Sequence, residues 1–272
     1  KRQGEEHVNK PTVKDTKTGK TLAEGTDYTL TYSDDVTNAG TVTVTVAGIG
    51  NYTGEFNVTY AITKRDVVLT SATDSKPYDG TPLTRPDVTV TGDGFVEGEV
   101  TKLRASGSVT TVEQGEVDNA IGYTVSDSFK AGNYNISYNV GTLKITAIPD
   151  EVTVTVKGNS DEKEYNGTEQ IVRGYTVTSI SNEHYKAEDF MLTKAAEAKG
   201  TEAGTYAMGL KAEDFVNISD NFTKVTFQVE DGSLTITPKS ITPDQPETPE
   251  EKKTGIEAVS YTHLRAHETL AN

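Results

Sequence analysis

The clearest pattern along the chain is a strict alternation of valine and threonine. It spans residues 42–46, 88–91 and 152–156, and each run is followed within two residues by a glycine. A period of two places all the valines of a run on one face of an extended strand and all the threonines on the other. Threonine is β-branched, so it favours the strand while tolerating solvent. We therefore predict three strands, each with one buried and one solvated face.

Two other pieces recur with these strands. Near the end of each predicted module there is an asparagine followed by an aromatic residue. A short closing strand comes after this pair. The asparagine–aromatic pairs are Asn51-Tyr52, Asn133-Tyr134 and Asn221-Phe222, and the closing strands are residues 60–63, 141–146 and 232–237. A repeated order of elements indicates repeated structural units. We predict an all-β, elongated chain of three small modules in tandem: 1–64, which looks truncated at its start, 65–147 and 148–239.

A short motif is written twice, 87 residues apart: Tyr78-Asp79-Gly80 and Tyr165-Asn166-Gly167, each followed by threonine. Glycine adopts positive φ without steric cost, and aspartate or asparagine bonds its own backbone, so these dipeptides are typical of tight turns. We predict structural turns at which one strand ends and the next begins. The alternative is a loop that grips a ligand, in which case Tyr78, Tyr165 and Tyr134 would be the contacts.

Helix signals are scarce. Residues 186–199 (KAEDFMLTKAAEAK) contain good helix formers but no apolar stripe, and residues 211–216 repeat their start. We predict strand or loop in both places; a single short helix in the third module is the alternative.

The C-terminal part differs from the rest. Prolines at positions 243, 246 and 249 favour extended chain, so residues 240–258 read as a semi-rigid Pro/Glu-rich linker. Residues 259–272 contain VSYTHLRAHET, which resembles the translation of a sequencing-library adapter and is interpreted as a non-native tail. We therefore give no weight to the metal pair that His263 and His267 would form on a helix.

The amino-acid composition limits the classes of partner that the chain is expected to bind. The 272 residues carry a formal charge of -15 with a pI near 4.7, which disfavours nucleic acids and anionic membrane surfaces. Hydrophobic residues make up 33% and tryptophan is absent, which suits several small cores better than one large core. Without cysteine there are no disulfides or thiolate metal sites. No apolar run reaches the roughly 20 residues of a membrane helix, so direct membrane insertion is not expected.

The sequence contains no recognisable combination of catalytic residues. Outside the tail only His7 and His184 are available as bases, and neither lies near a nucleophile motif. Acid pairs such as Glu188-Asp189 and Glu213-Asp214 lack EF-hand spacing and read as solvated faces, although weak calcium binding stays open. We expect no enzyme, no cofactor and no defined metal site. A Lys–Asn isopeptide bond also stays open, without a named pair.

Taken in order, Tyr-[Asp/Asn]-Gly-Thr, Asn-Tyr-x-Ile and a closing Gly-Thr-Leu-x-Ile-Thr resemble the "mostly β-grasp" (MBG) repeat of bacterial surface proteins. Module two carries all three pieces, module three resembles a longer variant, and module one a shorter companion repeat. The resemblance covers nearly all of residues 20–239. It implies a mostly β-grasp or sandwich-like fold, display at the cell surface or wall, and adhesion, and it supplies no catalytic residues.

Two functions remain at this point. The first is a non-catalytic spacer in an extracellular bacterial surface protein, an adhesin-like stalk in which each repeat contacts its neighbours. The alternative is a module that itself binds a glycan or a host surface protein.

Overall fold

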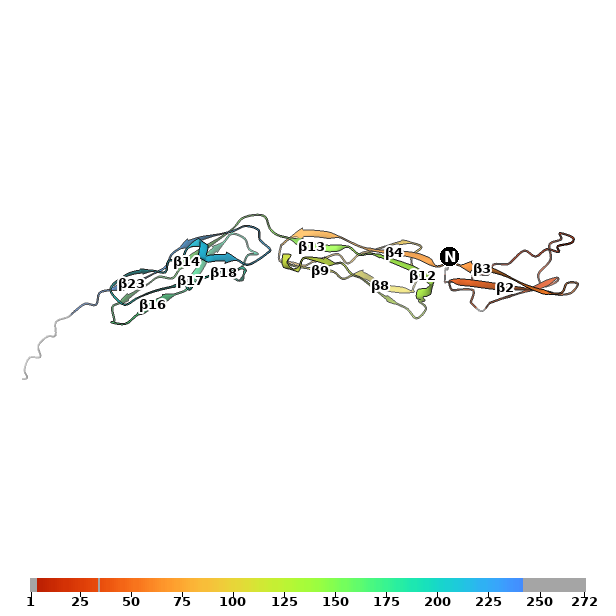
Figure 1. Ribbon diagram of the computed structural model, residues 1–272, viewed down its shortest axis with the longest axis horizontal. Coiled ribbons are helices and arrows are strands. Elements are labelled where there is room, and N and C mark those ends of the chain that lie inside the picture. Colours follow the sequence, from red (N-terminus) through yellow and green to blue (C-terminus); the bar gives the residue numbers. More distant parts are fainter. Residues whose placement is uncertain (1–3, 34, 242–272) are drawn as a thin grey trace, which may run out of the picture.

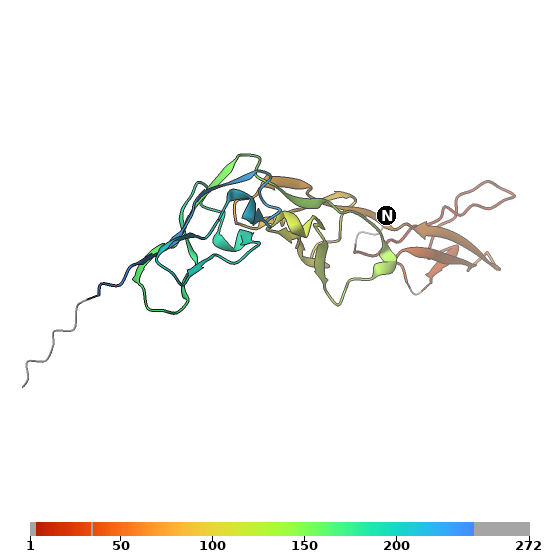
Figure 2. The same ribbon diagram turned by 60° about the vertical axis from the view of Figure 1, so that its left-hand side comes forward.

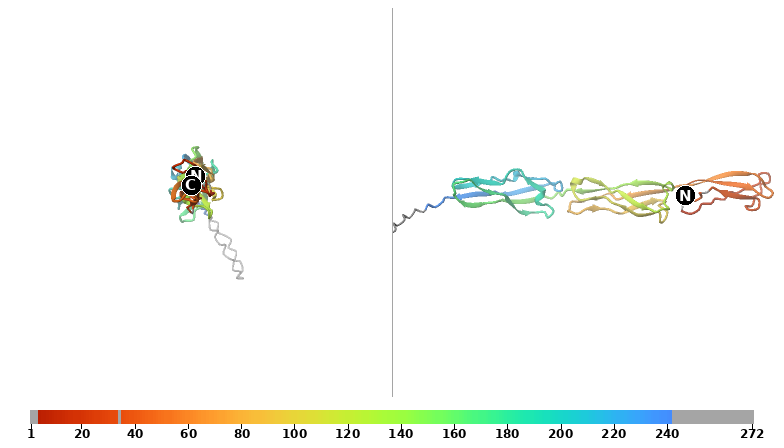
Figure 3. Two further views of the ribbon diagram at one scale, coloured as in Figure 1. Left: turned by 90° about the vertical axis from the view of Figure 1, so that its right-hand side faces the viewer. Right: turned by 90° about the horizontal axis from the view of Figure 1, so that it is seen from below.

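The structure, a computed structural model, describes residues 4–33 and 35–241. Figure 1 shows three β-rich bodies in a row: module one before residue 65, module two at 65–147 and module three from 148. The end-on view in Figure 3 shows that they follow one axis. Every strand ladder in the described part lies within one module. The all-β prediction is confirmed, because the only helical elements there are four 3-10 turns: Val112–Gln114, Ala131–Asn133, Ala187–Asp189 and Ala212–Asp214.

Module one is a single antiparallel meander. Its strands are β1 (Tyr28–Tyr32), β2 (Gly40–Gly48) and β3 (Glu55–Ile62), with β2 in the middle. The segment before β1 folds back over the inner face of this sheet, where Val13 packs with Tyr28 and Val46. The start of that segment lies beside module two, since a Cβ placed on Gly4 would be 2.9 Å from Val96.

Modules two and three have the same topology, strand for strand. Counting strands within each module, the first strand pairs with the fourth and the ninth, and the tenth pairs with the second and the seventh. Two further pairs join the third strand to the sixth and the fifth strand to the eighth. Module two contains β4 (Arg65–Ser71), β5 (Asp74–Pro77), β6 (Leu83–Thr84), β7 (Val88–Gly92), β8 (Val100–Ala105), β9 (Ser108–Val109), β10 (Glu116–Asp118), β11 (Ile121–Val125), β12 (Tyr134–Asn139) and β13 (Thr142–Thr146). Module three contains β14 (Val152–Gly158), β15 (Asp161–Glu164), β16 (Gln170–Arg173), β17 (Tyr175–Ile180), β18 (Phe190–Leu192), β19 (Glu197–Gly200), β20 (Gly204–Ala207), β21 (Phe215–Asn217), β22 (Val225–Glu230) and β23 (Ser233–Thr237).

In each of these modules the first two strands pair in parallel with the last two strands. In module two β4 pairs with β12 and β5 with β13, and in module three β14 pairs with β22 and β15 with β23. In each module the two ladders are separated by a break of two residues in each strand. At the break in module two the backbones come so close that a Cβ on Gly141 would lie 2.3 Å from the carbonyl oxygen of Ala72. Parallel terminal strands bring the chain in at one end of the module and out at the other, as Figure 2 also shows.

The cores follow the valine pattern in two of the three predicted strands. The valines of β2 and β14 are almost fully buried, at 0–1% exposure, and their threonines lie outside. In β7 the pattern fails: Val88 is half-buried and Val90 is 38% exposed. The strand β7 lies at the edge of its three-stranded sheet, so its valine face is covered less completely.

Two local predictions change in detail. The Asp79–Gly80 and Asn166–Gly167 turns do not close hairpins, because the strands on either side pair elsewhere: β5 with β13 and β6 with β9, and likewise β15 with β23 and β16 with β19. Residues 186–199 and 211–216 form 3-10 turns that lead into the short strands β18 and β21. The linker from residue 242 onwards and the tail at 259–272 lie outside the described residues.

Candidate functional site: the module junctions and the tip of module one

The two places where modules meet are built alike. We call the end of a module that faces the preceding module its leading end, and the end at which the chain leaves it the trailing end. The leading ends of modules two and three carry the asparagine–aromatic pairs that start β12 and precede β22. In both cases the aromatic ring enters its own module's core, since Tyr134 and Phe222 are only 4% and 3% exposed.

At the first junction Asn133 reaches into module one. Its Oδ1 accepts the backbone N–H of Ala39 at 2.8 Å, and its Nδ2 donates to Asn38 Oδ1 at 2.8 Å. Asn133 is 1% exposed, so these bonds are sheltered from water. The receiving turn is itself fixed by Asp35, whose carboxylate accepts the backbone N–H groups of Thr37 and Asn38 and the Asn38 side-chain amide.

At the second junction Asn221 repeats the contact. Its Oδ1 accepts the backbone N–H of Val112, also at 2.8 Å, from the 3-10 turn at the trailing end of module two. Its backbone carbonyl accepts the N–H of Ile148, the residue that connects the two modules. The same side chain therefore performs the same task at both junctions: it accepts a backbone N–H of the preceding module.

Tyr78 adds an apolar contact at the second junction. Its ring lies edge-on to Phe222, with centroids 5.7 Å apart, and edge-on to His184 at 6.2 Å. The half-buried Tyr78 packs against both the trailing core of module two and the leading core of module three. The sequence singled out Tyr78 for its turn, and the structure places it between two modules.

The turn after Tyr78 is held by side-chain bonds. The Asp79 carboxylate accepts hydrogen bonds from the Lys76 ammonium at 2.8 Å and from the N–H and hydroxyl of Thr81. The Lys76 bond and those from Thr81 hold the pKa of Asp79 well below its usual range. Gly80 has φ of 74°, and an added Cβ would lie 3.4 Å from His184.

The corresponding turn of module three lies at that module's trailing end. Asn166 Oδ1 accepts the N–H and hydroxyl of Thr168 at 2.9 Å, and Gly167 has φ of 79°. Tyr165 lines a cavity of about 420 Å³ with Glu202, Ala203 and residues 238–241. It thus occupies in module three the position that Tyr78 occupies in module two.

Tyr134, the third tyrosine considered as a ligand contact, has no exposed face to offer. Its ring stacks on Phe129 with centroids 5.3 Å apart, and its hydroxyl donates to the buried Glu99 carboxylate at 2.5 Å. This contact could not be predicted from the sequence, because Glu99 lies 35 residues away in the chain.

The sequence places an asparagine near the end of each module without indicating what it contacts. In the structure, Asn133 and Asn221 bond to the module before their own. A signal was available: the asparagine is repeated in all three modules while the residue after it changes between Tyr and Phe. A fixed polar residue at a module's end points to a partner outside that module.

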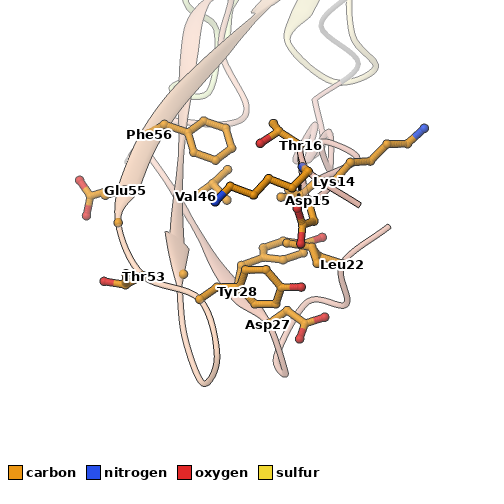
Figure 4. Close-up of a pocket in the computed structure, with 15 residues that line it drawn as sticks. Lys14, Asp15, Thr16, Leu22, Asp27, Tyr28, Val46, Thr53, Glu55 and Phe56 are labelled. Carbon is orange, nitrogen blue, oxygen red and sulfur yellow. Dashed lines mark hydrogen bonds between the residues drawn. The ribbon is translucent and has the colours of Figure 1, made fainter. Parts of the chain in front are cut away.

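The end of module one that lies away from module two, which we call the tip, has an open cavity of about 510 Å³ (Figure 4). The hairpin-like segment around Lys14 and Asp15 forms one wall, and β3 with Phe56 forms the other. Tyr28 and Val46 form the floor, while Phe56 is 52% exposed beside the cavity. Backbone N–H groups of Lys17 and Thr18 bond to Asp15 and lower its pKa.

No cluster of three histidine, cysteine or carboxylate residues is arranged to hold a metal ion within 4–33 and 35–241. Over the same ranges, no helix has the length and apolar character needed to cross a membrane.

Comparison with known proteins assigns one module. Residues 151–238, which contain β14 to β23, match the MBG domain family, a β-rich and non-catalytic family of modules. No curated protein matches the chain. No solved structure matches it either.

Proposed function

We propose that residues 4–241 are a non-catalytic spacer of an extracellular bacterial surface protein, an adhesin-like stalk. The observation that supports this most directly is the arrangement of terminal strands in modules two and three. Because the chain enters and leaves at opposite ends, each added module lengthens the molecule by its full long dimension.

The shared topology supports a tandem array. Module two has the strand order and pairing of the segment that matches the MBG family, although its own sequence gave no match. We infer that module two is a second module of this kind. A spacer needs repetition of a unit, whereas a reaction centre does not.

The junctions support a stiff spacer. An asparagine side chain bonded to the preceding module, and in one case a shared aromatic contact, restrict how far neighbouring modules can bend. The charge of -15 suits a molecule that must stay soluble and repel its neighbours on a crowded surface.

Surface display is tested with an antibody raised against residues 4–241 and applied to intact cells of the source bacterium. We expect staining of intact cells that is lost after brief treatment with an external protease. Staining that appears only after lysis would reject the proposal. Spacer behaviour is tested with the purified chain on glycan and mucin arrays, where a spacer gives no saturable binding.

The tip cavity favours one second candidate, a module that binds a glycan or a host protein through module one. The cavity combines apolar side chains, charged side chains and an exposed Phe56, which is the mixture typical of ligand sites. In that case the wild-type chain would bind saturably on an array and Phe56→Ser would abolish the signal. Val216→Ser, which changes a 42% exposed apolar residue of module three, serves as the matched control and should leave binding unchanged.

A further inference from the structure

In modules two and three the terminal strands pair in parallel over two successive ladders. In module two, six residue pairs join β4 to β12 and four more join β5 to β13. Module three has the same numbers, six pairs between β14 and β22 and four between β15 and β23. The two ladders of a module together run from its leading end to its trailing end.

This geometry determines how the module responds to a pull on its ends. The incoming chain is attached to the leading end of the first strand, and the outgoing chain to the trailing end of the last. Tension therefore slides the two strands along each other, and all the hydrogen bonds between them are strained at once. Had the chain entered and left at one end, the same bonds would break one after another.

Side chains reinforce the sliding pair. In module three Lys157 on β14 contacts Glu230 on β22 at 2.6 Å. Glu151 and Lys224, the residues just before these two strands, contact each other at 2.8 Å. In module two Asn135 donates to Asp66 at 2.9 Å across β4 and β12. These groups are exposed, so each is weak on its own, but they are strained together with the backbone ladder.

Module one is built differently. It has no parallel ladder of terminal strands in its described residues; its three strands form an antiparallel meander. Its first described residues lie near the end of β3, where the Tyr60 hydroxyl donates to the carbonyl of His7 and the His7 N–H to Val36. A pull between Glu5 and Ile62 therefore peels the module open from one end.

We propose that modules two and three are tension-bearing elements, in which the parallel terminal strands act as a clamp loaded in shear, and that module one yields first. This inference deepens the spacer function proposed above and rests on it for its biological meaning. The resistance of each module to force is a property of the purified chain and can be measured on it.

The test is single-molecule pulling, and the absence of cysteine from the chain allows handles to be placed at chosen thiols. Handles at Asp150→Cys and Ser240→Cys load module three in shear. Handles at Asp150→Cys and Asp220→Cys load the same β14–β22 pair from their common leading end. The three replaced residues are exposed, so folding should be unaffected. We expect a several-fold higher unfolding force in the first geometry at the same pulling speed.

Pulling the whole chain between Glu5→Cys and Ser240→Cys supplies an internal comparison. We expect one event at low force from module one, followed by two at high force from modules two and three. Each high-force event should lengthen the chain by about 250 Å. Roughly 85 residues extend to about 300 Å at about 3.5 Å each, and the folded module already spans about 45 Å, the length of residues 65–77 at about 3.3 Å each. Equal forces in the two geometries, or three events at one force, would overturn the clamp. Either result would leave the spacer proposal standing, since that is decided by surface staining and array binding.

Discussion

Tyr78 in module two and Phe222 in module three meet edge-on, with ring centroids 5.7 Å apart and ring planes at 78°. Phe222 belongs to the asparagine–aromatic pair of its module, and Tyr78 to the Tyr-Asp-Gly-Thr turn of the module before. Two motifs that recur separately in the sequence therefore meet at a junction. Modules two and three each carry both motifs, at opposite ends, and module one carries only the asparagine–aromatic pair.

Replacing Tyr78 should weaken the second junction. Tyr78→Ala removes an aromatic pair worth about 1 kcal/mol, and we expect the unfolding of modules two and three to become less coupled. Calorimetry should show that the melting temperature of the less stable of the two modules falls by roughly 4–8 °C. Tyr78→Phe keeps the ring and should behave as wild type. An unchanged melting profile for Tyr78→Ala would mean that the ring contact contributes nothing to the junction.

Removing the Asn221 side chain should loosen the same junction without unfolding either module. Asn221→Ala leaves the Val112 N–H without its acceptor, at a cost of about 1–2 kcal/mol. Spin labels at Thr101→Cys and Glu162→Cys, one in each module, should report a broader distance distribution. Asn221→Asp retains an acceptor oxygen and should keep the narrow distribution.

The tip supplies the negative control for this experiment. Asn51→Ala changes the equivalent residue of module one, and it should leave the distribution between modules two and three unaltered. Broadening by Asn51→Ala as well would show that the asparagines act through general stability and not through the junction.

Asn119 should be the most sensitive polar residue of module two. It is fully buried, and its side chain accepts the N–H of Gly107 at 3.0 Å and donates to the carbonyls of Arg85 at 2.8 Å and Ala72 at 3.2 Å. Asn119→Ala orphans all three groups, and we expect a loss of about 3 kcal/mol or more in the unfolding free energy of module two. Urea unfolding measures this. The exposed Asn139→Ala is the control and should cost under about 0.5 kcal/mol; similar losses for the two variants would contradict the prediction.

Acid should destabilise the turn that receives Asn133. Hydrogen bonds from the backbone and side chain of Asn38, and then from Thr37, lower the pKa of Asp35 to about 2. Because the folded pKa lies below the unfolded value, the stabilisation is complete above about pH 4 and is lost as the pH falls through about 2. The melting temperature of module one should therefore decline more steeply over this range than that of Asp35→Asn, which has no charge to lose. Parallel declines would show that Asp35 is not responsible.

Strand content and the repeated order of elements could be predicted from the residue pattern alone. Val-Thr alternation can bury a face only as a strand, so β2 and β14 could be placed from the pattern alone. The Asp-Gly and Asn-Gly turns could be placed as well, because the backbone conformation at Gly80 and Gly167 depends on a few neighbouring atoms. The tip cavity, in contrast, gave no sequence signal, since its walls come from residues far apart in the chain.

Strand pairing and the contacts of the repeated motifs could not be predicted in this way, because both join segments far apart in the chain. The parallel pairing of β4 with β12 joins Arg65 to Tyr134, and no local property of either strand selects a partner so distant. The same holds for Asn133 and Tyr78. The sequence shows which groups they carry, but whether these contact their own module or a neighbouring one depends on where the ends of the folded modules meet. Local geometry is fixed by neighbours in the chain, whereas a junction exists only after two cores have formed.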